Sequence, residues 1–559
     1  MAFQAFIRNL AAVLLLAALV FFAFGGALQC GFVRFDDHGY VYQNPQIAKG
    51  LTAEGICWAF TTVWQQWWLP FLWISYMADT ECFGTGPWGY HLTNLLLHAA
   101  NAGLLFWVCF RLTGARGRSL AVAALWAVHP LRVESVVWVT ERKDVLSGLY
   151  FFLALLAYER YARRPGWRRM GLVFAGMLSG LLSKATVIVL PALLLLLDLW
   201  PLRRAQVPWA PGEWKTWLRL IREKMPLFLL AGIFAAINLH THAGGIAAMP
   251  WMQRIALMAT NVWIYLRLAF WPARLAFFYP ENDAVAVGAA MAALAGLGAL
   301  VAGLVWLGRR RPYLLTGGLW FLVALLPVLR GIRLGLAGYA DRFTYLPSIG
   351  LALALVWAAG EAWERCRGVC FNQETDLSAR GPCLNHLPMA LTLALVLGLA
   401  LVSRRQTQTW RDSETLFRHA LAVTDNNTVA HANLAACLEE QDRRAEALEH
   451  LEAVVAIKPY LADSLNNLAW MLATDPDATP EQTARALELA RQAVQNAGVP
   501  IAAMLDTLGV AQAACGNYAA AAKTAERART LATGQGKAAL SEQIEARLRL
   551  YREGKPYHE

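Results

Sequence analysis

The residues of this chain best suited to chemistry are two adjacent aspartates, Asp36 and Asp37, which follow the first long apolar run at residues 7–28. Neighbouring carboxylates repel each other and cannot both be shielded by lipid, so they must face water, a cation or a reacting group. A solvated turn is the simplest alternative, because the segment reads Asp-Asp-His-Gly and these residue types favour turns. A chemical role therefore depends on whether later parts of the chain return polar groups to the same side of a membrane.

Later cations are suited to meet an anion beside this pair. They follow or separate apolar runs and comprise Arg142, Lys143, Lys184 and Arg342. The apolar runs on either side of Lys184 would each be about 20 Å long as helices, less than the roughly 30 Å hydrocarbon core, so this lysine would lie in an external dip. A lysine there is costly unless it faces an anion or water, and snorkelling to a lipid phosphate is the alternative.

Composition and charge spacing predict a membrane protein. The 559 residues are 57% hydrophobic with a formal net charge of +11, the mean hydropathy is +0.38, and the apolar residues come in repeated long runs. Arginine clusters within 160–169 and 309–311 mark cytoplasmic loops, so the positive charge indicates topology and not nucleic-acid binding. The pattern predicts about eleven spans within residues 1–403, with the N-terminus inside and the Asp36–Asp37 pair outside.

The first external loop, residues 30–88, is rich in tryptophan, tyrosine and phenylalanine. Residues 51–68 predict an amphipathic helix lying on the membrane, with its rings as interfacial anchors. Stacking of one or two of these rings on sugar faces is the alternative. The same loop holds Cys30, Cys57 and Cys82, which leaves one disulfide open.

A second group of cysteines raises a metal question. The cytoplasmic loop 359–386 holds Cys366, Cys370, Cys383 and His386. This spacing is compatible with zinc but not diagnostic of it, and free reduced thiols are the alternative.

The character of the chain changes after residue 403, where hydropathy falls. Residues 428–459 place leucine, alanine and proline at the offsets of a tetratricopeptide unit, and two further units follow. Residues 539–551 are typical of a polar capping helix. The pattern predicts an external tetratricopeptide α-solenoid over residues 404–559, and an unrelated helical bundle is the alternative.

Motifs along nearly the whole chain carry a family resemblance. In order they are Phe35–Asp37, Asn44–Pro45, His91–His98, His129–Val136, Glu141–Ser147, Leu182–Lys184, Asp341–Pro347 and Trp410–Phe417. Together they resemble bacterial relatives of the transmembrane tetratricopeptide-repeat O-mannosyltransferases. The resemblance implies an all-α fold, with a polytopic GT-C glycosyltransferase domain followed by the repeats, and a polyprenyl-phosphate-linked sugar as donor. It departs at Leu69 and Tyr76, where histidine is expected in many bacterial relatives.

The resemblance also implies roles for particular side chains. An acidic residue of the first external loop is catalytic in the family, so Asp37 is expected to be the base, with Asp36 orienting the site or holding a divalent cation. Phosphate of the donor needs cations as it gains charge, which suits Arg142, Lys143, Lys184 and Arg342. His129 and Glu134 would orient the acceptor or help hold a cation, and packing roles are equally open.

These expectations place the protein in a bacterial inner membrane, with its active site and repeats in the periplasm and an acceptor protein bound through the repeat groove. A non-enzymatic, membrane-anchored scaffold for envelope assembly is the main alternative. It explains the repeats, but it does not explain the external Asp, Lys and Arg residues. A transporter is disfavoured, because the membrane half lacks a clear internal repeat. The sequence names neither the sugar, the lipid carrier nor the acceptor.

Overall fold

The computed structural model describes residues 2–241, 250–280, 286–329, 338–371 and 383–559, and every regular element in these ranges is helical. The predicted all-α class is therefore confirmed for this part of the chain. The chain divides into two compact units, Met1–Leu416 and Phe417–Glu559.

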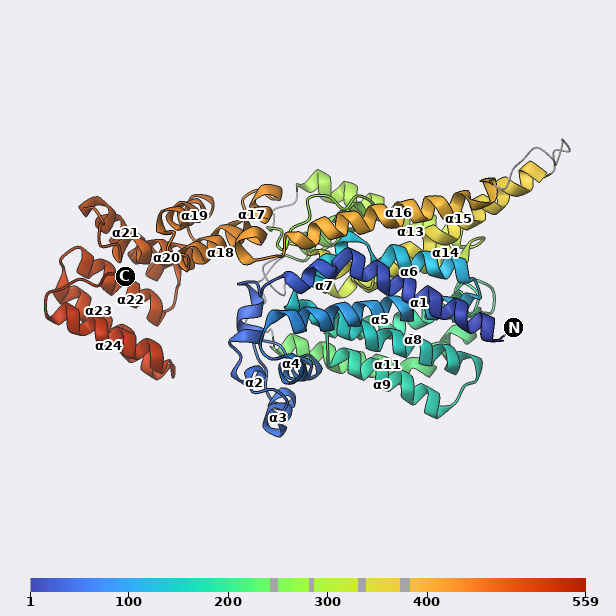
Figure 1. Cartoon of the computed structure of the whole chain (residues 1–559), viewed down its shortest axis with the longest axis horizontal. Coiled ribbons are helices and arrows are strands. Elements are labelled where there is room, and N and C mark those ends of the chain that lie inside the picture. Colours follow the sequence, from blue (N-terminus) through green and yellow to red (C-terminus); the bar gives the residue numbers. More distant parts are fainter. Residues whose placement is uncertain (1, 242–249, 281–285, 330–337, 372–382) are drawn as a thin grey trace. The chain divides into compact units, whose positions relative to one another are not determined.

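The first unit contains the long helices and several short ones. They are α1 (Ala2–Phe24), α2 (Pro45–Ala48), α3 (Ala53–Thr61), α4 (Pro70–Phe83), α5 (Pro87–Thr113), α6 (Arg116–Ala127), α7 (Val133–Val137), α8 (Arg142–Arg163), α9 (Trp167–Leu181), α10 (Leu190–Leu199), α11 (Trp214–Thr241), α12 (Trp251–Phe270), α13 (Val287–Gly308), α14 (Pro312–Leu325), α15 (Ser348–Phe371) and α16 (Cys383–Gln408). Helix α5 packs against both α1 and α8 (Figure 1). Gly317 and Gly350 let α14 and α15 approach closely, since a Cβ on either would meet the backbone oxygen of the other.

Within the ranges that the structure describes, four helices are long and apolar enough to cross a membrane. They are Phe3–Gln29, Pro87–Thr113, Val287–Gly308 and Leu387–Gln408. A fifth span is added if α6 and the segment Pro130–Val137, between which the chain bends by 61°, count as one broken span. The predicted membrane character is thus supported within the described ranges, and the total of eleven spans stays a prediction.

The helix in the first external loop is shorter than predicted. Helix α3 begins where Thr52 accepts a hydrogen bond from the Gly55 amide at 2.9 Å, but it ends at Thr61. Gln65 and Gln66 have φ angles of 50° and 66°, which no helix accommodates. The predicted helix over residues 51–68 is therefore wrong beyond Thr61, because the chain makes a tight turn there.

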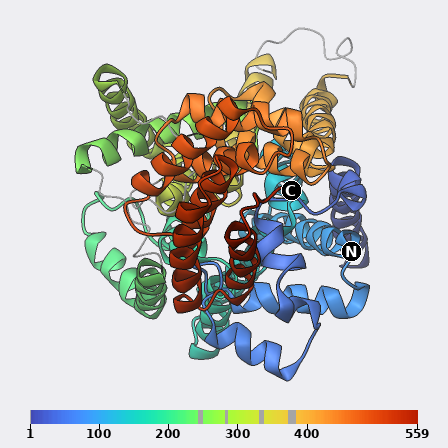
Figure 2. The same cartoon turned by 90° about the vertical axis from the view of Figure 1, so that its left-hand side faces the viewer.

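The second unit is a series of helix pairs. Following α17 (Ser413–Val423) they are α18 (Thr428–Glu439), α19 (Arg444–Ile457), α20 (Ala462–Ala473), α21 (Pro480–Asn496), α22 (Ala502–Ala514), α23 (Tyr518–Gly534) and α24 (Ala538–Arg552). Helix α20 pairs with α21, and α22 pairs with α23. Helix α23 also packs against α24, and α23 and α24 lie side by side in dark red (Figure 2). Ala486, Ala490 and Ala493 are buried along one face of α21, where small residues allow close packing. The tetratricopeptide assignment stays a prediction.

Candidate active site

Asp37 is a buried anchor between the first loop and the segment before α8. Its carboxylate is 1% exposed. One oxygen accepts from the Val33 amide at 3.0 Å, and the other accepts from the Thr140 amide at 3.0 Å and the Thr140 hydroxyl at 2.5 Å. Burial raises the pKa of Asp37 to about 6, although the hydrogen bonds from Thr140 and Val33 oppose that rise. Both oxygens are therefore already engaged by protein donors.

Asp36, the preceding residue, has a different environment. It is partly exposed, and among the described residues it makes neither a hydrogen bond nor an ion pair. Burial raises the pKa of Asp36, whereas the positive charges of Lys143 and Arg342 oppose the rise. Of the two aspartates, Asp36 thus has the carboxylate that remains available to a substrate.

A charged cluster lies near Asp36. It consists of Glu134, Glu141, Lys143, Asp144, Lys184 and Arg342. One oxygen of Glu141 lies 3.0 Å from the Lys143 ammonium and 3.2 Å from Nε of Arg342. The other oxygen accepts from the Lys184 ammonium at 3.0 Å. Three of the cations predicted to meet a phosphate therefore converge on one buried carboxylate.

Two further carboxylates balance these cations. Asp144 accepts from the Lys184 ammonium at 2.7 Å. Glu134 accepts from the Arg342 amide at 2.8 Å and also pairs with its guanidinium. Burial alone would raise the pKa of Glu141, but Lys143, Lys184 and Arg342 hold it below its usual value. With all six groups ionised, the charged cluster is electrically neutral.

The charged cluster is assembled from segments far apart in the sequence. Lys184 follows α9, and its amide donates to the Gly180 carbonyl at 2.8 Å. Arg342 lies in a 3-10 turn, Asp341–Thr344. Lys143 and Asp144 lie in the first turn of α8. Turns and helix ends between apolar elements thus bring the charges together, which is where backbone can bend sharply enough to do so.

Aromatic rings surround two of the cations. The Lys143 ammonium lies 5.3 Å from the ring centroid of Tyr40 and 5.7 Å from that of Trp67. The Arg342 guanidinium lies 5.4 Å from the ring centroid of Trp138. The turn that ends α3 carries Trp67 to this position. Trp67, one of the rings predicted to anchor the first loop in the membrane interface, therefore also contacts the charged cluster.

Arg142 lies apart from the cluster, although it was grouped with these cations by sequence. It is fully buried and pairs with Asp79. Its guanidinium donates to the Asn94 side chain at 2.8 Å and to the Tyr90 carbonyl at 2.8 Å. It also lies over the Tyr76 ring, 4.7 Å from the centroid. Arg142 thus ties α8 to α4 and α5, and its donors face these helices.

His129 is also held by the backbone. Its Nε2 lies 3.0 Å from the Ala269 carbonyl oxygen, and its Nδ1 accepts from the Leu131 amide at 3.3 Å. These contacts fix the sharp turn before α7 against the end of α12. They correspond to the packing role that the sequence left open, whereas Glu134, five residues downstream, reaches the cluster.

The described residues add no support for the metal sites that the sequence left open. The described residues contain no group of three or more His, Cys, Asp or Glu side chains placed to hold a metal ion. The oxygens of Asp37 already accept hydrogen bonds, which compete with a cation at the aspartate pair. The side chains of Cys370, Cys383 and His386 lie outside the described residues.

Three residues that sequence reasoning did not assign to the site prove central to it. Glu141 joins the three cations, Asp144 pairs with Lys184, and Thr140 holds Asp37. The available signal was the run Thr-Glu-Arg-Lys-Asp at residues 140–144, a dense group of charges in a short turn between apolar segments. Cys30, Cys57 and Cys82 are free thiols, so the disulfide left open for the first loop is not formed.

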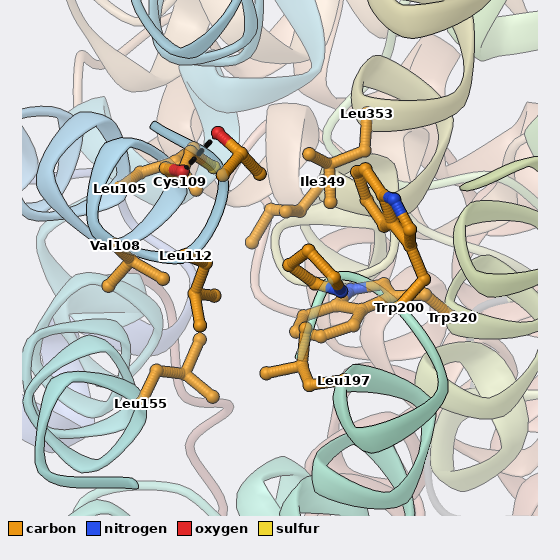
Figure 3. A pocket seen from close by; sticks show the side chains of 12 residues that line it. Leu105, Val108, Cys109, Leu112, Leu155, Leu197, Trp200, Trp320, Ile349 and Leu353 are labelled. Carbon is orange, nitrogen blue, oxygen red and sulfur yellow. Dashed lines mark hydrogen bonds between the residues drawn. The ribbon is translucent and has the colours of Figure 1, made fainter. Parts of the chain in front are cut away.

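A separate apolar pocket lies among α5, α8, α10, α14 and α15 (Figure 3). Leu112, Leu155 and Leu197 line it together with Trp200 and Trp320. None of its lining residues belongs to the charged cluster. The lining is largely apolar, with Cys109 and Thr113 as its polar side chains.

No family model matches this chain. It is 25% identical to Protein O-mannosyl-transferase TMTC1 of Homo sapiens over 519 residues, which cover 81% of this chain and 56% of that protein. It is 26% identical to Protein O-mannosyl-transferase Tmtc1 of Drosophila melanogaster over 564 residues, which cover 82% and 63%. The chain thus spans less than two thirds of the length of either relative.

Proposed function

We propose that this chain, a relative of the protein O-mannosyl-transferases, is a membrane glycosyltransferase that moves a sugar from a polyprenyl-phosphate carrier to a hydroxyl group of a protein. The observation that carries the proposal is a partly exposed aspartate, Asp36, within the influence of Lys143 and Arg342, two cations that converge with Lys184 on Glu141. That arrangement offers a base for the acceptor and positive charge for the leaving phosphate.

Asp36 is the base in this proposal, and Asp37 positions it. The sequence-based expectation gave these roles in the opposite order. A base must have an oxygen free to take the proton, and both oxygens of Asp37 already accept hydrogen bonds from Val33 and Thr140. Asp36 has no such partner among the described residues and lies within the influence of Lys143 and Arg342.

The reaction balances with these groups alone. The acceptor hydroxyl oxygen forms a bond to the anomeric carbon of the sugar while the bond from that carbon to the phosphate oxygen breaks. Asp36 takes the hydroxyl proton, and the carrier leaves as a polyprenyl phosphate with one additional negative charge. Lys143, Lys184 and Arg342 stabilise that charge, because preorganised cations act most strongly where charge develops.

Glu141 keeps the cations in place when no donor is bound. Without its carboxylate, only Glu134 and Asp144 would balance the three cations, and a net positive charge would remain in a largely buried site. The side chains of Lys143, Lys184 and Arg342 keep exposed fractions of 9%, 11% and 16%. An anion can therefore approach their outer sides while Glu141 holds their inner sides.

Residues 1–403 form a GT-C-like domain with about eleven spans, and residues 404–559 form a tetratricopeptide α-solenoid that presents the acceptor. The active site and the repeats face the periplasm of a bacterial inner membrane. The helix pairs α20–α21 and α22–α23, followed by α24, support the repeat assignment.

Intact mass spectrometry of periplasmic proteins tests the proposal. Cells with and without the chain are compared, and cells producing Asp36→Asn serve as the control for a present but inactive protein. Hexose-sized mass increments that require both the chain and Asp36 support the enzyme. Identical acceptor masses in all three strains, with envelope assembly lost only when the chain is absent, would favour the scaffold function.

A further inference from the structure

In the second unit, the residues after α24 turn back onto the helices before them. The amide of Glu559 donates to the Thr474 carbonyl at 3.0 Å. The indole N–H of Trp470 donates to the side-chain carboxylate of Glu559 at 2.9 Å. The ring of Tyr557 lies 6.0 Å from that of Trp470 and 5.2 Å from the guanidinium of Arg547. An irregular segment is thus bound through its main chain, an aromatic ring and a carboxylate.

The surface that receives this segment is built in advance. We call Trp470, Asp506 and Arg547 the aromatic–arginine platform; they come from α20, α22 and α24. Arg547 is 6% exposed, and its guanidinium makes two hydrogen bonds to the Asp506 carboxylate, at 3.2 and 2.5 Å. The guanidinium also lies 5.2 Å from the Trp470 ring centroid. The bidentate pair fixes the plane of the guanidinium, which leaves one face for an incoming ring.

The platform lies on one particular set of helices. Helix α22 packs against both α20 and α24, and α21 and α23 are the intervening partners of the pairs. The platform therefore uses alternate helices, those on one side of the helix series. Stacked helix pairs present such a side as a continuous binding surface for an extended chain.

We infer that the aromatic–arginine platform is a peptide-binding site and that residues 553–559 are its internal occupant. The external ligand is an extended segment of the acceptor protein that carries an aromatic residue and, two positions later, a carboxylate. Its ring takes the place of Tyr557, and its carboxylate takes the place of Glu559. The identification of the ligand as an acceptor rests on the proposed function; the binding site does not.

The internal segment is suited to displacement. Glu553, Lys555 and Glu559 are exposed, and Tyr557 is only half-buried. A tethered segment competes at an effective concentration in the millimolar range, so it reduces the apparent affinity of any external peptide. Removing its two anchoring side chains should therefore unmask the platform without altering the helices.

The test uses the full chain in detergent and a fluorescent peptide with the sequence of residues 554–559, Gly-Lys-Pro-Tyr-His-Glu, blocked at both ends. Anisotropy measures its binding to the parent chain and to the double variant Tyr557→Ala, Glu559→Ala. We expect the double variant to bind at least about tenfold more tightly. Adding Trp470→Phe, which keeps a ring but removes the N–H donor, should reverse most of that gain.

Circular dichroism confirms that each variant keeps its helices, and a peptide with alanine and glutamine in place of its tyrosine and glutamate is the control ligand. Equal binding by the parent and the double variant would overturn the inference, as would a gain that survives Trp470→Phe. A double variant that dimerises without binding the peptide would also overturn it, because a second copy would then be the occupant. Sugar transfer is not measured, so failure here leaves the proposed enzyme standing, and a failed transfer assay leaves the platform standing.

Discussion

Replacing Thr140 with valine tests how the buried aspartate is held. The Thr140 hydroxyl donates to the Asp37 carboxylate at 2.5 Å, beside the Thr140 amide at 3.0 Å. Valine has nearly the same shape but no hydroxyl, so Thr140→Val removes one hydrogen bond and keeps the other. A hydrogen bond to a charged group contributes about 1.5–3 kcal/mol, which is the expected loss in the free energy of unfolding when Asp37 is ionised.

The loss should depend on pH. Burial raises the pKa of Asp37 from 3.8 to about 6 in the folded protein, so the folded state binds more protons than the unfolded state between these values. Stability contributed by this group therefore falls as pH rises from about 4 to 6 and is constant above. Thr140→Val removes a donor that favours the charged form, so the pKa rises further and the fall continues to higher pH. The substitution should thus cost more at pH 8 than at pH 5.

Denaturant unfolding in detergent at both pH values measures this difference, with Thr140→Ser as the control because serine keeps the hydroxyl. We expect Thr140→Val to lose about 1.5–3 kcal/mol at pH 8 and less than about 1.5 kcal/mol at pH 5, where the carboxyl is mostly protonated. Equal stabilities of the valine and serine variants at both pH values would refute the anchoring role of the hydroxyl.

Three other predictions follow from the site and the topology. Lys184→Ala and Arg342→Ala should each weaken binding of a polyprenyl-phosphate sugar in a titration with the folded protein, because each removes a phosphate partner; unchanged affinity in both would favour interaction of Lys184 with lipid headgroups instead. Reporter fusions after residue 415 should be periplasmic and fusions after Cys366 cytoplasmic, and a cytoplasmic signal at residue 415 would contradict the placement of the repeats. Deleting residues 420–559 should preserve donor binding but abolish transfer to natural acceptors, since helix pairs pack mainly on their neighbours; full transfer by the truncated chain would contradict a recognition role.

Much of the site could be anticipated from sequence because its charges occupy positions where lipid makes charge costly. That argument singles out Lys184 between two short apolar runs, whereas Arg342 is expected from the topology and the family resemblance, and both lie in the charged cluster. The helical class was implied by the family resemblance, and the long apolar runs and the repeat offsets agreed with it. The end of α3 did not, because nothing in Gln65 or Gln66 predicts the left-handed backbone that both adopt.

The directions of individual side chains could not be predicted from the sequence. Arg142 and Lys143 are consecutive residues of α8, and consecutive helical side chains point about 100° apart. Lys143 therefore faces Glu141, while Arg142 faces Asp79. The adjacent residues Asp36 and Asp37 also differ, because Thr140 and Val33 anchor the Asp37 carboxylate inside the protein and no described residue does the same for Asp36. A run of charges thus locates a site, but only the packed helices decide which members of the run belong to it.

The most direct test of the proposed function is the rate of sugar transfer by Asp36→Asn. Asparagine has nearly the same shape as aspartate but cannot take the acceptor proton, and loss of a general base typically lowers the rate by about 100- to 10,000-fold. We expect that fall with donor binding and stability close to those of the parent chain, because Asp36 makes no hydrogen bond among the described residues. Transfer by Asp36→Asn at the parental rate would contradict the account, and if Asp37→Asn alone lost transfer with its stability intact, the base would be Asp37.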